Sequence, residues 1–178
     1  MPDPFRELVT GSRMYGDLAT IRTVMIEAQA DRPPGRMTLV HGQCPPRHPH
    51  TKRPIPWKVA ERLSRIEQSY LRGADWLAAW IAVDLGWVTE PHPADWEGPC
   101  RPTCQRGHRR GGRRGSICPA AGDYRNEDMV ATGVLRCDGF LLPCRDPGCR
   151  RTEPHATHGA DGCLTLAEAA GIRTERHT

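Results

Sequence analysis

Phe-Arg-Glu-Leu-Val-Thr-Gly-Ser-Arg, residues 5–13, begins with a short apolar run and ends in a glycine turn. The segment that starts at Asp17 carries apolar residues at helical spacing, which predicts an amphipathic helix. These residues are Ile21, Val24, Met25 and Ala28. A strand-like run follows at 37–40, bounded by Pro33-Pro34-Gly35 before it and His41-Gly42 after it. Strand, glycine turn, helix and strand together form one βαβ unit.

The same alternation continues along the chain. Further helices are expected at 73–86, 125–132 and 164–170, and further strands at 87–90 and around 140–142. Gly86 and Gly171 are placed to end two of these helices. Strands that alternate with helices are typical of an open parallel sheet with helices on both faces. The sequence therefore predicts a single Rossmann-like α/β domain over residues 1–178.

Three polar insertions interrupt this pattern, at about 43–72, 97–122 and 143–158. Only 38% of the 178 residues are hydrophobic and 6% aromatic, with 18 Gly and 17 Pro, so the core should be small and the loops long. This length excludes a large multidomain enzyme. No apolar run approaches the roughly 18 residues of a membrane span, and Met1 to Arg13 lacks an export pattern. We expect a soluble, cytoplasmic protein without a membrane partner.

Glycine residues lie at three places where an expected strand ends or an expected helix begins. Gly11, Ser12 and Arg13 follow the first strand, Gly42 follows the second, and Gly159-Ala160 precedes the last helix. Parallel sheets bind ligands beyond the carboxyl ends of their strands, where helix N-terminal N–H groups attract phosphate. Each turn alone is equally well explained by local turn chemistry. Three turns along one edge favour a cleft that binds phosphate groups.

Six short motifs in this chain resemble those of a known family. They are Leu8-Val9-Thr10-Gly11-Ser12-Arg13, Val40-His41-Gly42-Gln43-Cys44, Gly73-Ala74-Asp75, Pro93-Ala94-Asp95-Trp96, Arg125-Asn126-Glu127-Asp128-Met129-Val130 and Ala170-Gly171-Ile172. In this order they resemble the YspA-type, YpsA-related SLOG family of actinobacteria and their phages, which is related to the DprA and LOG proteins. The resemblance covers Leu8 to Ile172 and leaves the insertions as variable parts.

The resemblance implies a Rossmann-like fold whose cleft binds a nucleotide or a nucleotide-derived ligand, such as an ADP-ribose or NAD-like molecule. The resemblance implies that these three glycine turns bind the phosphate groups of the ligand. Asp75, Arg125 and Asn126 would face the cleft from helix starts. For Asp75, helix capping is an alternative role, and Arg125 could instead be a surface side chain.

One departure from the family bears on catalysis. LOG phosphoribohydrolases use a Gly-Gly-x-Gly-Thr-x-x-Glu stretch, in which the Glu serves hydrolysis. Alignment on Gly159 places Ala160 at the Thr and Cys163 at the Glu. The sequence thus favours a binding or sensing module over an enzyme. A nucleotide-processing hydrolase remains an alternative.

Two groups of cysteine and histidine lie in the insertions, and both predict structural zinc. The first is Cys100, Cys104, His108 and Cys118. The second is Cys144, Cys149, His155 and His158. Thiolates and imidazoles at short spacing suit a closed tetrahedral site that supplies folding energy to a loop without a core. In the second group, His158 could serve the cleft instead, and Cys137 could replace a ligand. Unpaired reduced cysteines in a disordered insertion are the alternative for the first group.

The net charge of +4 is concentrated in one arginine-rich stretch at 106–114. A zinc-bound loop carrying arginines could bind the phosphates of DNA or RNA. It lacks interleaved aromatic residues for base stacking. A DprA-like single-stranded DNA-binding protein is therefore the rival prediction. The sequence leaves open whether the chain forms a homo-oligomer.

Overall fold

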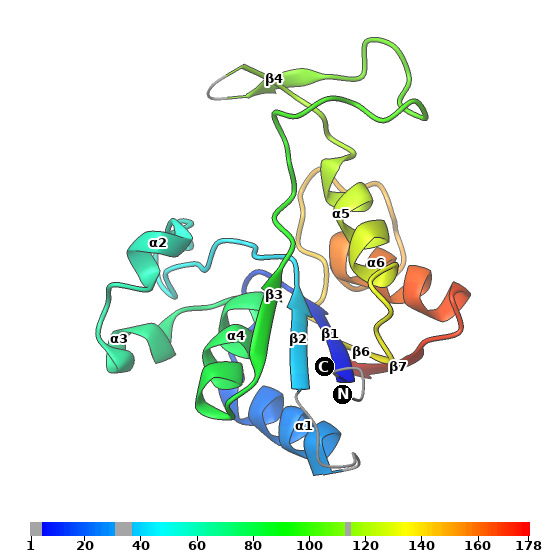
Figure 1. Ribbon diagram of the computed structural model, residues 1–178. Coiled ribbons are helices and arrows are strands. Elements are labelled where there is room, and N and C mark those ends of the chain that lie inside the picture. Colours follow the sequence, from blue (N-terminus) through cyan, green and yellow to red (C-terminus); the bar gives the residue numbers. More distant parts are fainter. Residues whose placement is uncertain (1–4, 31–36, 113–114) are drawn as a thin grey trace.

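The computed structural model describes residues 5–30, 37–112 and 115–178. Its centre is a sheet of five parallel strands in the order β3-β2-β1-β6-β7 (Figure 1). The strands are β1 (Phe5–Gly11), β2 (Met37–His41), β3 (Val88–Pro91), β6 (Arg136–Phe140) and β7 (Arg173–His177). This arrangement confirms the predicted Rossmann-like parallel sheet.

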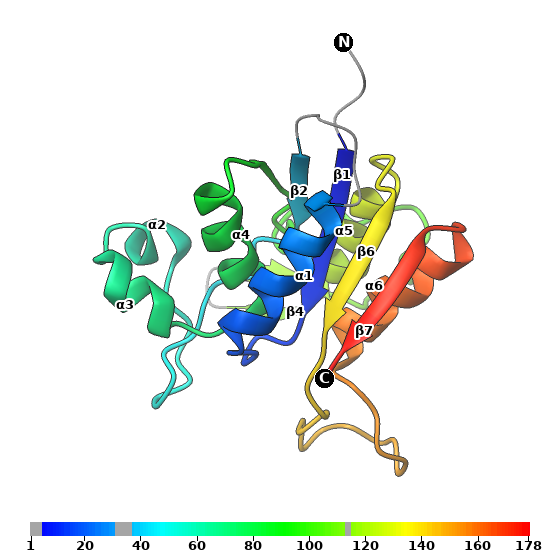
Figure 2. The same cartoon turned by 90° about the horizontal axis from the view of Figure 1, so that it is seen from below.

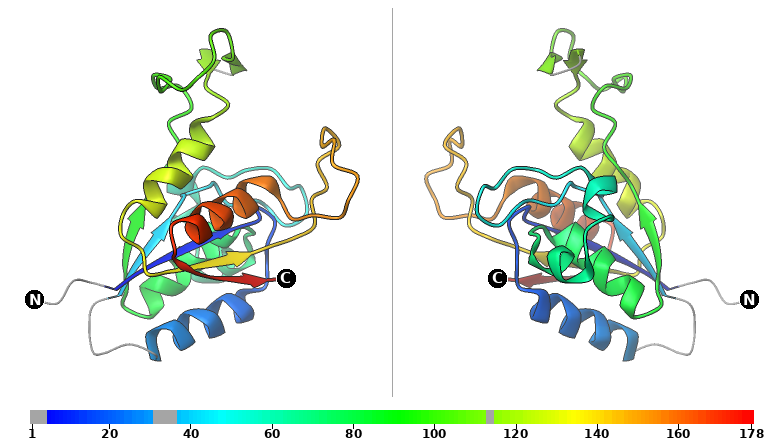
Figure 3. Two further views of the ribbon diagram at one scale, coloured as in Figure 1. Left: turned by 90° about the vertical axis from the view of Figure 1, so that its right-hand side faces the viewer. Right: turned by 90° about the vertical axis from the view of Figure 1, so that its left-hand side faces the viewer.

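Two helices cover each face of the sheet (Figure 3). They are α1 (Leu18–Ala30) and α4 (Ala74–Asp84) on one face, and α5 (Ala121–Val130) and α6 (His158–Ala169) on the other. Each pair closes a separate apolar core, the first around Met25, Leu39 and Leu77 and the second around Met129, Leu141 and Leu164. Helices on both faces were therefore predicted correctly.

The strand order reverses direction at β1. The chain runs outward from β1 to β2 and β3, then returns to place β6 and β7 on the other side of β1. Such a switch point opens a crevice at the carboxyl ends of the two central strands. In Figure 2 the loops after β2 and β6 extend beyond these strand ends.

Two helices begin earlier than expected. α5 begins at Ala121, so Arg125 and Asn126 lie in its second turn and not at a helix start. α6 begins at His158, so Gly159 and Ala160 lie in its first turn and not in a turn before it. In both segments, polar and small residues occupy the first turn, so the apolar period starts only later.

The insertion at 43–72 holds two short helices. These are α2 (Trp57–Ala60) and α3 (Arg65–Tyr70), separated because Ser64 and Glu67 form a reciprocal capping box that starts a new helix. The apolar side chains of Ile66 and Tyr70 on α3 are not packed, since they are 71% and 64% exposed.

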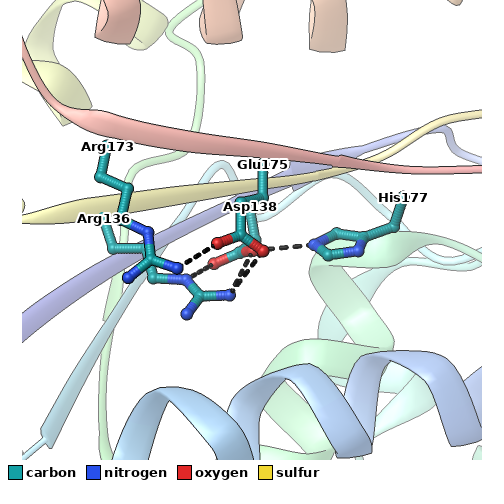
Figure 4. Close-up of polar contacts among 5 residues, drawn as sticks. All are labelled: Arg136, Asp138, Arg173, Glu175 and His177. Carbon is teal, nitrogen blue, oxygen red and sulfur yellow. Dashed lines mark hydrogen bonds and ion pairs between the residues drawn. The ribbon is translucent and has the colours of Figure 1, made fainter. Parts of the chain in front are cut away.

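The sheet contains charged residues that apolar patterning missed. β6 begins at Arg136, whose Nε and Nη2 donate to Asp138 at 2.6 and 2.9 Å. From β7, the Nε2 of His177 lies 2.8 Å from the Asp138 carboxylate. Figure 4 shows these side chains pointing toward one another. Because the bidentate pair neutralises itself, both residues can be buried.

Two cysteine-containing segments project from the body in different directions (Figure 3). One carries an unpredicted antiparallel hairpin, β4 (Arg110–Gly112) and β5 (Gly115–Ile117), and the other connects β6 to α6. Among the described helices, none has the length and apolarity needed to cross a bilayer.

Candidate functional site

A cleft of about 280 Å³ lies at the switch point, between the ends of β1 and β6 and the starts of α4 and α6. Most of the residues predicted to bind a ligand line it. These are Gly11, Ser12, Arg13, Asp75, Arg125, Gly159 and Ala160. Gly42 and Asn126 are buried and are not among the lining residues. The structure thus gathers side chains that lie up to 150 residues apart in sequence around one cavity.

Gly11 serves close packing at the end of β1. A Cβ at this position would lie 2.4 Å from the Cβ of Ala74 and 2.5 Å from the carbonyl oxygen of Phe140. Both distances are far inside van der Waals contact. Glycine is therefore required so that α4 and β6 can approach the end of β1, and its predicted role in a phosphate turn stays a prediction.

Ser12 joins three elements at the switch point. Its Oγ lies 2.7 Å from the Oγ1 of Thr157 and accepts a 2.8 Å hydrogen bond from the backbone N–H of Leu142. Its own N–H donates to the carbonyl of Phe140 at 2.8 Å. The hydroxyl therefore ties the end of β1 to the segments around Leu142 and Thr157, and its predicted role in ligand binding stays a prediction.

Arg13, like Arg145, is an exposed cation at the cleft. Its side chain is exposed, and no hydrogen bond or ion pair involves its guanidinium within the described parts of the chain. It also borders a second, mainly apolar pocket of about 550 Å³ formed by Met14, Leu142 and Pro143. Arg13 is thus positioned to bind an anion without breaking a protein contact.

Arg125 is held rigidly, in contrast to Arg13. Its Nη1 donates to the carbonyl of Gly42 at 2.7 Å, and its Nε donates to Asn126 Oδ1 at 3.0 Å. A Cβ on Gly42 would lie 1.6 Å from Nη1, so glycine there makes room for the guanidinium. Gly42 therefore makes room for Arg125 and does not itself line the cleft. The Nη2 group has no hydrogen-bond partner among the described residues.

Two predicted polar residues support the cleft from within the protein. Asn126 donates from Nδ2 to the carbonyl of Gly159 at 3.1 Å, which ties α5 to α6. Asp75 accepts a 3.0 Å hydrogen bond from the backbone N–H of Cys44 and makes no helix-capping bond. Asp75 lies in the first turn of α4, where a carboxylate also suits the helix dipole, but the N-cap residue is Gly73.

The environment of Asp75 and Arg125 affects two neighbouring groups. Burial, reinforced by the Asp75 carboxylate, raises the pKa of the Cys44 thiol. Burial lowers the pKa of His41 to about 4, against the opposing pull of Asp75. Both side chains are thus neutral near pH 7, and the local charges are those of the arginines and carboxylates.

The first turn of α6 presents backbone donors to the cleft. The first intrahelical bond in this turn runs from Asp161 N–H to the carbonyl of Thr157, so the N–H groups of residues 158–160 have no carbonyl partner within the helix. Thr157 at the N-cap makes no side-chain capping bond. Three unpaired N–H groups and the helix dipole favour an anion at this end.

Cys163 does not reach the cleft. It is fully buried on α6, and its contact with Cys137, together with burial, raises the pKa of Cys137. The position that would carry the LOG glutamate therefore faces the core between α6 and β6. Cys137 is likewise part of this core, so it is not an alternative metal ligand.

The ligand atoms of the first cysteine and histidine group are spaced as a tetrahedral zinc site would require. Zinc bonds of about 2.3 Å to sulfur and 2.0 Å to nitrogen would place two sulfurs about 3.8 Å apart and sulfur and nitrogen about 3.5 Å apart. Cys104 and Cys118 lie 3.8 Å apart, and the Nε2 of His108 lies 3.4 Å from Cys100 and 3.2 Å from Cys118. A disulfide needs about 2.05 Å. The group is therefore compatible with zinc.

Neighbouring residues support this first group, and spacing alone did not reveal them. The Nδ1 of His108 lies 2.5 Å from the Gln105 carbonyl, which leaves Nε2 free to bind metal. The hydroxyl of Tyr124 lies 2.6 Å from the Cys104 sulfur. Arg109 donates to the Gly98 carbonyl at 2.9 Å and to Ser116 Oγ at 2.8 Å. Arg109 is thus a structural residue of the loop.

The ligand atoms of the second group also lie close together. The Cys149 sulfur lies 3.3 Å from the Nε2 of His155 and 3.1 Å from that of His158, and the two nitrogens are 3.3 Å apart. All four ligand atoms, Cys144 included, lie within 4.8 Å of one another. The Nδ1 of His155 contacts the Glu153 carbonyl at 2.7 Å, as in the first group. This geometry is compatible with a second zinc ion.

A third group of potential ligands, Asp138, Glu175 and His177, does not suit a metal. Arg136 already donates two hydrogen bonds to the Asp138 carboxylate and lies 3.3 Å from Glu175. A second cation there would be repelled by the guanidinium. This group is part of the buried charge network of the sheet.

If both groups bind zinc, the purified protein should contain two zinc ions per chain. Cys104→Ser should reduce this to about one, because a site that loses a thiolate binds zinc much more weakly. The segment 98–122 should then become sensitive to protease. Elemental analysis and limited proteolysis measure both effects. Metal-free wild-type protein with an equally resistant segment would contradict the assignment.

The arginine-rich stretch is only partly available to a partner. Arg106 and Arg110 are exposed, whereas Arg109 is occupied by contacts within the loop. Arg113 and Arg114 lie outside the described residues.

Comparison with known proteins identifies no relative. No family model matches the chain, and neither the curated proteins nor the solved structures include a significantly similar one.

Proposed function

We propose that this chain is a SLOG-like module that binds or senses a nucleotide or nucleotide-derived ligand, such as ADP-ribose, in the switch-point cleft. One observation carries the proposal. The unpaired N–H groups of residues 158–160 and the guanidinium groups of Arg13 and Arg125 meet at one cavity. Backbone donors at a helix start combined with arginine are a typical phosphate-binding arrangement.

The adjoining apolar pocket supports a ligand larger than phosphate. It shares Ser12, Arg13 and Thr157 with the cleft and continues toward Met14 and Leu142. A ligand with a phosphate group in the cleft could place an uncharged ring system against this apolar wall. Pockets for such ligands are mostly apolar with a few placed polar groups.

The carboxylates at the cleft are not arranged for hydrolysis, which favours a role in binding. Asp75 is occupied by the Cys44 N–H, and Asp146 accepts a 2.9 Å hydrogen bond from the Gly148 N–H. At the LOG glutamate position, Cys163 is buried. Among the described residues that line the cleft, these two aspartates are the only carboxylates, and neither is paired with a second acid or base. A sensing or binding role therefore fits better than a nucleotide-processing hydrolase.

A DprA-like nucleic-acid-binding protein is the second candidate. Exposed Arg106 and Arg110 on the projecting segment favour it. The two candidates differ in salt dependence, because a protein that neutralises several backbone phosphates loses affinity steeply with salt. ADP-ribose and a single-stranded oligonucleotide, each titrated at two salt concentrations, separate them.

Arg13→Ala should weaken ADP-ribose binding about 10- to 150-fold, since a hydrogen bond to a charged group contributes roughly 1.5 to 3 kcal/mol. Because Arg13 has no contact to lose within the described parts of the chain, the melting temperature should stay unchanged. Isothermal titration calorimetry measures the affinity.

The matched control is Arg106→Ala/Arg110→Ala, which removes two exposed arginines from the projecting segment. It should bind ADP-ribose like the wild type. If the control loses affinity and Arg13→Ala does not, the ligand site lies on the arginine-rich segment and the cleft proposal is wrong.

A further inference from the structure

The second cysteine and histidine group is built into the wall of the cleft. Cys144 and His158 are potential metal ligands and also line the cleft. His158 is the first residue of α6, so it directly precedes the N–H groups of Gly159 and Ala160. The first group, in contrast, lies on the segment that projects beyond α5 (Figure 1). Only the second group therefore shares residues with the cleft.

Residues 143–157, the wall segment, make few contacts of their own. Its base is closed by hydrogen bonds from Cys144 N–H to the His155 carbonyl at 2.8 Å and from Thr157 N–H to the Leu142 carbonyl at 3.2 Å. Beyond this base, residues 145–148 and 150–154 are exposed, and Cys149 is the half-buried exception. A segment without an apolar core depends on other interactions for a fixed conformation.

We propose that metal binding by Cys144, Cys149, His155 and His158 orders the wall of the cleft and thereby controls its affinity for the ligand. Four protein ligands from the wall and from α6 would hold one zinc ion and fix these two elements relative to each other. Arg145 and Asp146, which line the cleft between two of the ligands, would be fixed with them. This inference rests on the proposed ligand function of the cleft.

The proposed effect is ordering and not direct attraction. Two thiolates and two neutral imidazoles around Zn²⁺ give no net charge, so the site adds little to the field on a phosphate. Four protein ligands also complete the tetrahedron and leave no open position for a ligand atom. The control would therefore act through the position of the wall and the start of α6.

Linkage makes the coupling reciprocal. If the metal raises the affinity for the ligand by some factor, the ligand must raise the affinity for the metal by the same factor. Coupling between sites is typically 5- to 150-fold. ADP-ribose should therefore slow the removal of one zinc ion by a chromogenic chelator and leave the other unaffected.

The test compares Cys149→Ser with Cys100→Ser as the matched control. Each variant removes one thiolate from one group, and each should lose about one zinc ion. Cys149→Ser is expected to lose at least about fivefold in ADP-ribose affinity, whereas Cys100→Ser should bind like the wild type. His155→Cys, which keeps four ligands, should retain both zinc and affinity.

A second measurement compares the zinc-loaded and zinc-free forms of one variant. In Cys100→Ser, zinc is removed with chelator and then restored. The affinity for ADP-ribose should fall and return, and amide exchange at Thr157 and Asp161 should speed up and slow again. Thermal unfolding of each form shows whether the sheet stays folded.

The outcomes separate the two proposals. If zinc-loaded wild-type protein does not bind ADP-ribose, ADP or inorganic phosphate, the proposed function fails and the coupling fails with it. If wild type and folded Cys149→Ser bind equally well, the coupling alone is wrong. Equal losses in Cys149→Ser and Cys100→Ser would also overturn it, because the effect would not be specific to the cleft wall.

Discussion

Replacement of Asp138 by alanine should lower the free energy of unfolding by about 3 to 5 kcal/mol, the usual cost of removing one partner of a buried ion pair. Asp138 is fully buried and Arg136 is 3% exposed, so the guanidinium would lose its bidentate partner without gaining water. Glu175, 3.3 Å from Arg136, would compensate in part and favour the lower end of this range. Urea denaturation measures the change.

The control for this prediction removes both charges together. Arg136→Met/Asp138→Leu removes the bidentate pair and keeps similar volume, while Glu175 keeps Arg173 as a partner. Replacement of a buried ion pair by apolar residues is often neutral or stabilising. The double variant should therefore be more stable than Asp138→Ala. Equal destabilisation of both would show that packing, and not charge, makes this part of the sheet sensitive.

This network also shows why part of the fold escaped prediction. α1 and α4 were predictable because their apolar residues fall at helical spacing, and β2 because it is a short apolar run bounded by turn residues. β7 reads Arg-Thr-Glu-Arg-His, and β6 begins with Arg136 and Asp138, so neither follows an apolar pattern. Their charges are compensated across neighbouring strands, a relation that local sequence does not reveal.

The candidate metal groups were predictable for a related reason. All the ligands of each group lie within one insertion or at its edge, so their spacing along the chain indicates their proximity. The cleft depends on residues from distant segments. Sequence placed Arg13 and Asp75 at the cleft correctly, yet it could not show that Gly42 makes room for Arg125 or that Ser12 bonds to Thr157.

Gly11→Val should destabilise the fold by about 3 kcal/mol or more, at the upper end of the cost of overpacking a core. The added side chain would meet the Phe140 carbonyl oxygen, which is backbone and is held by the sheet, as well as Ala74. Relief would require separation of β1 from β6 or displacement of α4. Thermal unfolding, followed by circular dichroism, measures the loss.

Gly159→Ala is the comparison that separates packing from ligand contact. A Cβ at Gly159 has no neighbour within 4 Å, and alanine stabilises a helix by up to about 1 kcal/mol over glycine. This variant should therefore unfold at the wild-type temperature or slightly above it. Because Gly159 lines the cleft, a loss of ADP-ribose affinity in this stable protein would come from the ligand site. Gly11→Val unfolding like the wild type would instead mean that β1, β6 and α4 pack less closely than the structure shows.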